Sequence, residues 1–235
     1  EELERRMPNK LHLKKADLIT CSGRAQIDYL STFISSNKLA YLPLGIDTKS
    51  FRPLKEKKNR DKNLVICVGN NRRDYNTLEK IYLILKKNRP SIKLKLAGSL
   101  QAKDNFTDHP EVEILPFLSE KKFRDLYNKA SILLLPLLEG GSSQTLNEAL
   151  SSGLPVITNS FPNLLDYTNT KAVLTFQPKD FRSMAHACLD LLDDEKKINL
   201  MSETARLHML NYDNSIIKKK LINIYKSYLG VKINE

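Results

Sequence analysis

Apolar and polar residues follow one another along this 235-residue chain in blocks of two kinds. Short apolar runs, typical of strands buried on both faces of a sheet, occupy residues 64–68, 92–97, 112–115, 132–138, 156–158 and 172–176. Segments with apolar residues at helical spacing occupy residues 75–87, 119–129, 146–150, 179–193, 195–209 and 213–229. Strands that alternate with helices of this length predict an α/β fold, a Rossmann-like parallel sheet with helices on both faces.

The residues before Gly45 do not join this alternation. They contain a short apolar strand at 18–21, a helix at 24–35 and an apolar run at 39–44, too little to bury a sheet face. We therefore expect them to be the end of another domain, or an annex packed on this one. A polar stretch at 54–63 predicts a linker or an exposed loop. Because the chain opens with Glu1 rather than Met, we also expect a fragment of a longer protein or a split subunit.

The net charge is +11 and the isoelectric point is about 9.4. Two interpretations stay open: a basic surface that simply faces water, or a peripheral contact with a membrane. Without a nucleic-acid motif or interleaved aromatic residues, we expect no nucleic-acid partner. No apolar run reaches the roughly 18 residues that span a bilayer, and no signal peptide is visible, so we expect a cytoplasmic protein. Three cysteines without metal or disulfide spacing are expected as small core residues in a reducing compartment: Cys21, Cys67 and Cys188.

A glycine- and serine-containing turn separates the apolar run at 132–138 from the next helix. Its residues are Gly140, Gly141, Ser142, Ser143 and Thr145. Backbone N–H groups at such a turn, with the hydroxyls, suit a phosphate or a sugar. The turn is equally consistent with a simple strand-to-helix connection that needs glycine and a serine cap. A P-loop is excluded and a nicotinamide site is not expected, because neither glycine motif occurs.

Two consecutive arginines, Arg72 and Arg73, precede the helix that starts near Asp74. Cations at a helix amino end oppose its dipole, which predicts an anion between them and the helix. A diphosphate would suit the bidentate arginine geometry. The other interpretation is an exposed pair bridged to Asp74.

Glu148 lies within two turns of the start of the helix at 146–150, directed away from its buried face at about 100° per residue. It is either a carboxylate favoured by the helix dipole or an acceptor for two ribose hydroxyls. The histidines His12, His109, His186 and His208 have no metal-like or triad-like companions, so we assign no catalytic base, metal or cofactor.

Several segments, taken together and in the order in which they occur, resemble the carboxyl-terminal half of a GT-B retaining glycosyltransferase of family four. The resemblance extends from about residue 16 to about residue 229 and includes ADLITCSG, YLPLGIDTKSFRP, LVICVGNNRRDYNTLEKI, LKLAGS and TLNEALSSGLPVITN. It implies that residues 1–46 are the end of the acceptor domain with the crossover, and that 47–235 form the domain for a nucleotide-sugar donor. The implied reaction transfers a hexose from a nucleotide diphosphate sugar to a glycan or lipid-linked hydroxyl acceptor.

The resemblance also implies roles for individual residues. Arg73, with Arg72 beside it, would bind the donor diphosphate, and Glu148 would hold the ribose. The turn residues would line the sugar and diphosphate, while Phe117 and Leu118 would lie near the base. The resemblance thus assigns Arg73 and Glu139 as catalytic, with no metal.

One spacing departs from the family. Eight residues separate Glu139 from Glu148, where the family has seven, so either the turn has one extra residue or the first-glutamate role is absent. This departure and the missing amino-terminal domain leave an alternative open: a non-catalytic nucleotide-binding or interaction module, or half of a split enzyme. A nucleotide-sugar epimerase of the same fold is a further alternative, although the paired glutamates and the Arg-Asp-Tyr segment are more typical of a transferase.

Overall fold

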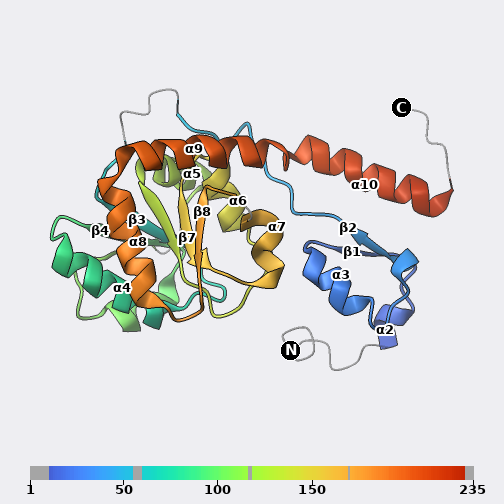
Figure 1. The fold of residues 1–235 in the computed structure, drawn as a ribbon, viewed down its shortest axis with the longest axis horizontal. Helices are drawn as coiled ribbons and strands as arrows, with labels where there is room; N and C mark the ends of the chain where they lie inside the picture. The colour runs from blue at the N-terminus through green and yellow to red at the C-terminus, as the bar shows by residue number, and fades with distance from the viewer. Residues whose placement is uncertain (1–10, 55–59, 116–117, 169, 231–235) are drawn as a thin grey trace.

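The computed structural model describes residues 11–54, 60–115, 118–168 and 170–230 (Figure 1). Six parallel strands form the main sheet in the order β5-β4-β3-β6-β7-β8. Their bounds are β3 Leu64–Val68, β4 Lys93–Ala97, β5 Glu113–Leu115, β6 Ile132–Leu135, β7 Val156–Asn159 and β8 Val173–Phe176. The predicted six-stranded parallel sheet is therefore confirmed.

Strands β3 and β6 lie side by side in the middle of the sheet. Strands β4 and β5 follow outward from β3, and β7 and β8 follow outward from β6. Residues Val65 and Ile66 pair with Ile132 and Leu133. In open α/β sheets, ligands bind at such a switch point, beyond the carboxyl ends of the two strands. The loops after β3 and after β6 are therefore the ones that the topology selects for a site.

Helices cover the sheet on both faces. They are α4 Tyr75–Asn88, α5 Glu120–Lys129, α6 Gln144–Ser151, α7 Leu165–Thr168, α8 Phe181–Asp193 and α9 Glu195–Leu210, and a further helix, α10 Asn214–Leu229, follows α9. Helix α4 packs against α8, and α6 packs against α9, with the strands enclosed between these helices (Figure 1). Every residue of β3, β6 and β7 is buried, as their unbroken apolar runs predicted.

Two predicted elements extended too far toward the carboxyl terminus. The strand expected at 132–138 ends at Leu135, and the carbonyl of Pro136 accepts from the backbone N–H of Asp74 at 3.0 Å instead of continuing the ladder. The helix expected at 24–35 is α3 Arg24–Leu30. It ends where the hydroxyls of Ser31 and Thr32 bond to helix carbonyls, an arrangement that competes with continued helix.

The described amino-terminal residues form a small unit with a sheet of its own. Strands β1 Ile19–Cys21 and β2 Leu39–Tyr41 make a two-stranded parallel sheet beside α2 Leu11–Lys14 and α3. Helix α10 extends from the α/β domain toward this sheet (Figure 1), and Nζ of Lys220 lies 4.3 Å from the ring centre of Tyr41. The crossover is held at Ile46, whose N–H donates to Tyr212 and whose carbonyl accepts from Asn214.

The polar stretch at 54–63 is more than an exposed loop. Residues 55–59 lie outside the described residues, but Arg60 is partly buried and donates to the backbone carbonyls of Ala130, Ser152 and Gly153 at 2.8–3.2 Å. Burial lowers the pKa of Arg60 to about 10. Its guanidinium thus ties the carboxyl ends of α5 and α6 together, and the expectation of an exposed loop is wrong at this residue.

The three cysteines are buried and free, which confirms their predicted place in the core. Among the described helices, none combines the length and apolar character needed to cross a bilayer.

Candidate functional site

The loops that follow β3 and β6 are hydrogen-bonded to each other at the carboxyl edge of the sheet. The N–H of Leu138 donates to the carbonyl of Arg72 at 2.9 Å, and Arg73 pairs with Leu137 in an isolated antiparallel bridge. This pairing brings the arginines beside the glycine turn. The predicted meeting of these two segments at one sheet edge is confirmed.

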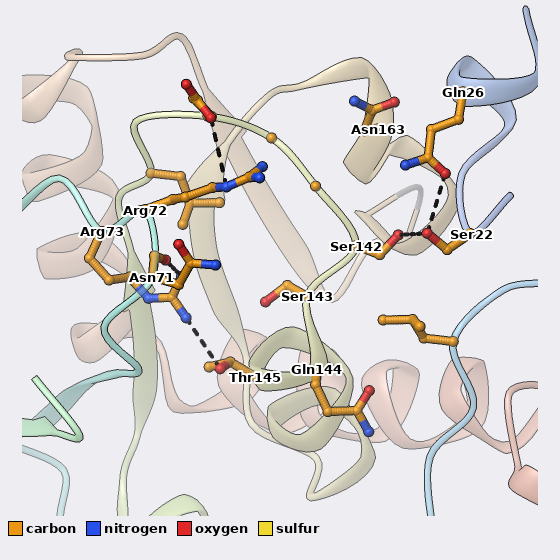
Figure 2. A pocket seen from close by; sticks show the side chains of 15 residues that line it. Ser22, Gln26, Asn71, Arg72, Arg73, Ser142, Ser143, Gln144, Thr145 and Asn163 are labelled. Atoms are coloured by element: carbon orange, nitrogen blue, oxygen red, sulfur yellow. Dashed lines mark hydrogen bonds and ion pairs between the residues drawn. The ribbon is translucent and has the colours of Figure 1, made fainter. Parts of the chain in front are cut away.

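Arg72 and Arg73 point in different directions (Figure 2). Arg72 has a φ of 60°, a left-handed conformation that is uncommon for residues other than glycine and costs about 1–2 kcal/mol. Nε of Arg72 lies 3.7 Å from Oε2 of Glu139. Asp74, the other partner considered for the arginines, caps α4, and its carboxylate accepts from the N–H and hydroxyl of Thr77.

Arg73 is braced by its own loop. It donates from Nε to the carbonyl of Val68, from Nη1 to that of Asn71 and from Nη2 to Oγ1 of Thr145. Since a guanidinium has five N–H donors, three are engaged within the protein and two remain for a ligand. A side chain at Gly69 would place Cβ 2.6 Å from Nη2 of Arg73, so this glycine makes room for the guanidinium.

The glycine turn leads directly into α6. Oγ of Ser143 accepts from the N–H of Leu146 at 3.3 Å, so the expected serine cap is present. The first N–H groups of α6 have no partner inside the helix, and their positive end faces the pocket formed by the turn and the arginines. The turn is therefore the capped strand-to-helix connection that the sequence allowed for, and it borders the pocket.

Gly140→Ala is expected to destabilise the fold by about 1–3 kcal/mol, the usual cost of overpacking. A Cβ at residue 140 would lie 2.1 Å from Cβ of Phe161, and relief requires backbone movement. The matched control is Gly141→Ala, whose Cβ would meet only the end of the Arg72 side chain, at 3.2 Å. Urea unfolding of both variants checks this, and an equal loss of stability would contradict the steric argument.

The pocket at this edge has a volume of about 570 Å³. It is lined by Ser22, Gln26, Leu44, Asn71, Arg72, Arg73, Leu137, Glu139, Gly140, Gly141, Ser142, Ser143, Gln144, Thr145 and Asn163. All of the predicted turn residues, both arginines and Glu139 thus share one cavity. None of the described histidines lines it.

One end of the pocket is built from neutral side chains that the sequence analysis did not single out. Oγ of Ser142 donates to Oγ of Ser22 at 2.7 Å, and Ser22 donates to Oε1 of Gln26 at 3.3 Å. Figure 2 shows Asn163 near the same end, opposite the arginines. Ser22 and Gln26 belong to the amino-terminal unit, and no sequence spacing relates them to the turn.

Glu148 lies outside the lining of this pocket. It is partly buried, and its Oε2 accepts from the hydroxyl of Tyr127 at 2.9 Å. Burial raises the pKa of Glu148, and the nearby Glu120 adds to this rise. The expectation that it points away from the core is therefore only partly right, since its partner Tyr127 is fully buried.

The two residues expected near a nucleotide base lie in the loop after β5. Leu118 is partly buried and packs against the hydrophobic core. Phe117 falls outside the described residues.

Residues 62–194 match the family model described as glycosyl transferases group 1. The chain belongs to this family. A search of curated proteins found no match to the sequence.

Solved glycosyltransferase structures share the fold of this group 1 chain. A glycosyltransferase from Rickettsia africae aligns with a TM-score of 0.75 and 15% identity, over 99% of this chain and 68% of that one. The carboxyl-terminal domain of LpcC from Francisella tularensis aligns with a TM-score of 0.60 and 15% identity, over 72% of this chain and 100% of that one. HepE from Anabaena in complex with UDP-glucose aligns with a TM-score of 0.76 and 13% identity, over 90% of this chain and 64% of that one.

The share of each solved structure that aligns shows which part of a glycosyltransferase this chain resembles. The α/β domain has the fold of a GT-B carboxyl-terminal domain, as the complete alignment of the LpcC domain indicates. The chain spans less than two thirds of HepE. At these low identities the likeness establishes the fold.

Proposed function

We propose that this chain binds a nucleotide diphosphate sugar and serves as the donor-binding part of a retaining hexosyltransferase. The observation that carries the proposal is the division of one pocket into two chemically different ends. Arg72, Arg73 and the amino end of α6 make one end suitable for a diphosphate. Ser22, Gln26 and Asn163 make the other end suitable for the hydroxyls of a sugar.

The proposed chemistry is electrostatic. As the bond between the sugar and the diphosphate breaks, negative charge grows on the leaving phosphate oxygens. Arg73 is held in place by three hydrogen bonds before any ligand arrives, so it stabilises this charge with little rearrangement. Glu139 lines the same cavity and contacts Arg72, which supports a role at the reacting end. The hydroxyl acceptor, a glycan or a lipid-linked sugar, would enter with an amino-terminal domain.

The relatives support the nucleotide part of this proposal. HepE, which shares the fold, is described in complex with UDP and glucose and in complex with UDP-glucose. Another protein of the same fold is a sucrose-phosphate synthase from Thermosynechococcus elongatus, with a TM-score of 0.78 and 18% identity.

Calorimetric titration of UDP and GDP, each into this chain, tests the proposal. We expect one of them to bind, with inorganic pyrophosphate binding more weakly because it lacks the nucleoside. Binding of neither nucleotide at millimolar concentration would contradict the proposed donor site. Transfer assays with the full-length protein then separate a transferase from a module that only binds.

A further inference from the structure

Helix α10 packs through one side only. Ile224 and Tyr228 line a cavity together with Ala40 of β2. Nζ of Lys220 lies 4.3 Å from the ring centre of Tyr41, which belongs to the same strand. No residue of α10, which the structure describes throughout, is fully buried. The helix therefore rests against the small amino-terminal sheet and leaves its other side in solvent.

The side of α10 that faces away from the small sheet combines lysines with exposed apolar residues. Along it lie Lys218, Ile222, Tyr225 and Leu229, each three or four residues after the last, so they form one stripe on the helix. Lys219 borders this stripe. Ile222, Tyr225 and Leu229 are 37%, 50% and 58% exposed. We call these five residues the outer face of α10.

The charged residues of α10 are all of one sign. Between Asn214 and Leu229 the helix carries four lysines and no aspartate or glutamate. Apolar residues that lie between cations, with no acid in the same helix, suit a surface that is apolar and negatively charged. A second copy of this chain would instead bring like charges together. The charge of α10 therefore favours an anionic lipid surface over self-association.

Helix α9 extends the exposed apolar surface. Leu200, Leu207 and Leu210 are 63%, 65% and 40% exposed, and their spacing places them on one side of α9. Figure 1 shows α9 and α10 following one another along one edge of the molecule, with the α/β domain and the amino-terminal unit on the same side of both. The exposed sides of the two helices therefore point the same way.

We propose that the outer face of α10, continued by the exposed leucines of α9, docks this chain onto the surface of an anionic lipid bilayer. The lysines attract the negatively charged headgroups, and Ile222, Tyr225 and Leu229 insert between them. Of the two interpretations that the net charge of +11 left open, this is the peripheral membrane contact. The inference goes beyond the proposed function and does not depend on it, because the outer face shares no residue with the lining of the pocket at the sheet edge.

Co-sedimentation of this chain with lipid vesicles tests the inference. We expect binding to vesicles of phosphatidylcholine and phosphatidylglycerol in equal parts, and little binding to phosphatidylcholine alone. The double variant Lys218→Gln/Lys219→Gln should bind the mixed vesicles about 20- to 30-fold more weakly, since each lysine near an anionic surface contributes about 5-fold. Added salt should weaken the binding of wild type, because it screens these charges.

Lys86→Gln/Lys87→Gln is the matched control for charge. These two lysines are also adjacent and lie near the carboxyl end of α4, on the side of the α/β domain away from α10 (Figure 1). The control lowers the net charge by the same amount and should bind the mixed vesicles as wild type does. Urea unfolding of both double variants checks that the fold is intact.

A fluorescent probe tests the apolar part of the surface. The chain has no tryptophan, so Tyr225→Trp places a single indole on the outer face. We expect its emission to shift to shorter wavelength when mixed vesicles are added, because the indole enters the interfacial region of the bilayer. Leu83→Trp is the control, at a position of α4 that is 48% exposed, and should show no shift.

Several results would overturn the inference. If wild type does not bind the mixed vesicles, the outer face is not a membrane surface. If the two lysine pairs have equal effects, total charge and not α10 attracts the lipid. If the indole at residue 225 shows no shift, the apolar residues stay out of the bilayer. If the chain sediments as a dimer that Ile222→Gln dissociates, a second copy covers the face. If vesicle binding is lost when the chain is joined to a complete amino-terminal domain, that domain covers it.

Discussion

Arg73→Ala is expected to weaken nucleotide binding by about 30-fold or more, because removing one partner of a desolvated charge pair costs about 2–5 kcal/mol. The loss has two sources. The two N–H donors that would face the phosphates in the proposed site are removed, and the bonds to Val68, Asn71 and Thr145 that keep the loop in shape disappear. Calorimetric titration of the nucleotide that binds wild type measures the effect.

Arg73→Lys separates these two sources. Lysine keeps the charge but lacks the planar fork, so we expect an intermediate loss of affinity. Arg182→Ala removes an exposed arginine from the start of α8 and is the control for net charge. Unfolding measured on each variant reports the structural contribution. Unchanged nucleotide affinity in Arg73→Ala would remove this arginine from the proposed donor site.

Arg60→Ala is expected to lower the free energy of unfolding by about 2–3 kcal/mol, since hydrogen bonds to a charged group contribute about 1.5–3 kcal/mol. The guanidinium donates to three carbonyls at the carboxyl ends of α5 and α6, where a cation also interacts favourably with the helix dipoles. Without it, these carbonyls lose their donor in a partly buried place. Urea or thermal unfolding measures the loss.

Lys62→Ala is the matched control for Arg60. Lys62 is a nearby cation whose side chain is 71% exposed and pairs with Glu195 at 2.8 Å. Exposed ion pairs contribute at most about 1 kcal/mol, so this variant should remain close to wild type. Equal stability of the two variants would show that the three carbonyl bonds contribute little.

The arrangement of Arg72 and Arg73 indicates how two adjacent cations serve one pocket. The left-handed backbone at Arg72 turns the two side chains apart, so that one contacts Glu139 and the other contacts Thr145. The strained conformation is therefore tied to the distribution of positive charge along the pocket.

The amino-terminal unit contributes directly to the pocket. Ser22 and Gln26 continue the hydrogen-bond chain that starts at Ser142, and the side-chain amide of Gln144 donates to the carbonyl of Gly45 at 3.2 Å. Changes in how this unit sits on the α/β domain would consequently alter the neutral end of the pocket more than the arginine end.

The apolar pattern alone determined the α/β class, the six parallel strands and the separate character of the residues before Gly45, because strand and helix periodicities are local properties of a chain. It also indicated that the loop with Arg72 and Arg73 and the turn at Gly140 share one sheet edge, since carboxyl ends of parallel strands lie together. The close approach of these two segments depended on β3 and β6 being neighbours, which is a matter of strand order.

Polar contacts between distant segments were decided only by the tertiary structure. Arg60 in a lysine-rich stretch resembles any solvated cation until α5 and α6 present their carbonyls to it. Ser22 and Tyr127 likewise carry no periodic signal that would link them to Ser142 and Glu148. Burial of apolar side chains repeats with the geometry of a helix or strand, whereas a hydrogen bond joins two particular atoms that only the packed chain brings within 3 Å.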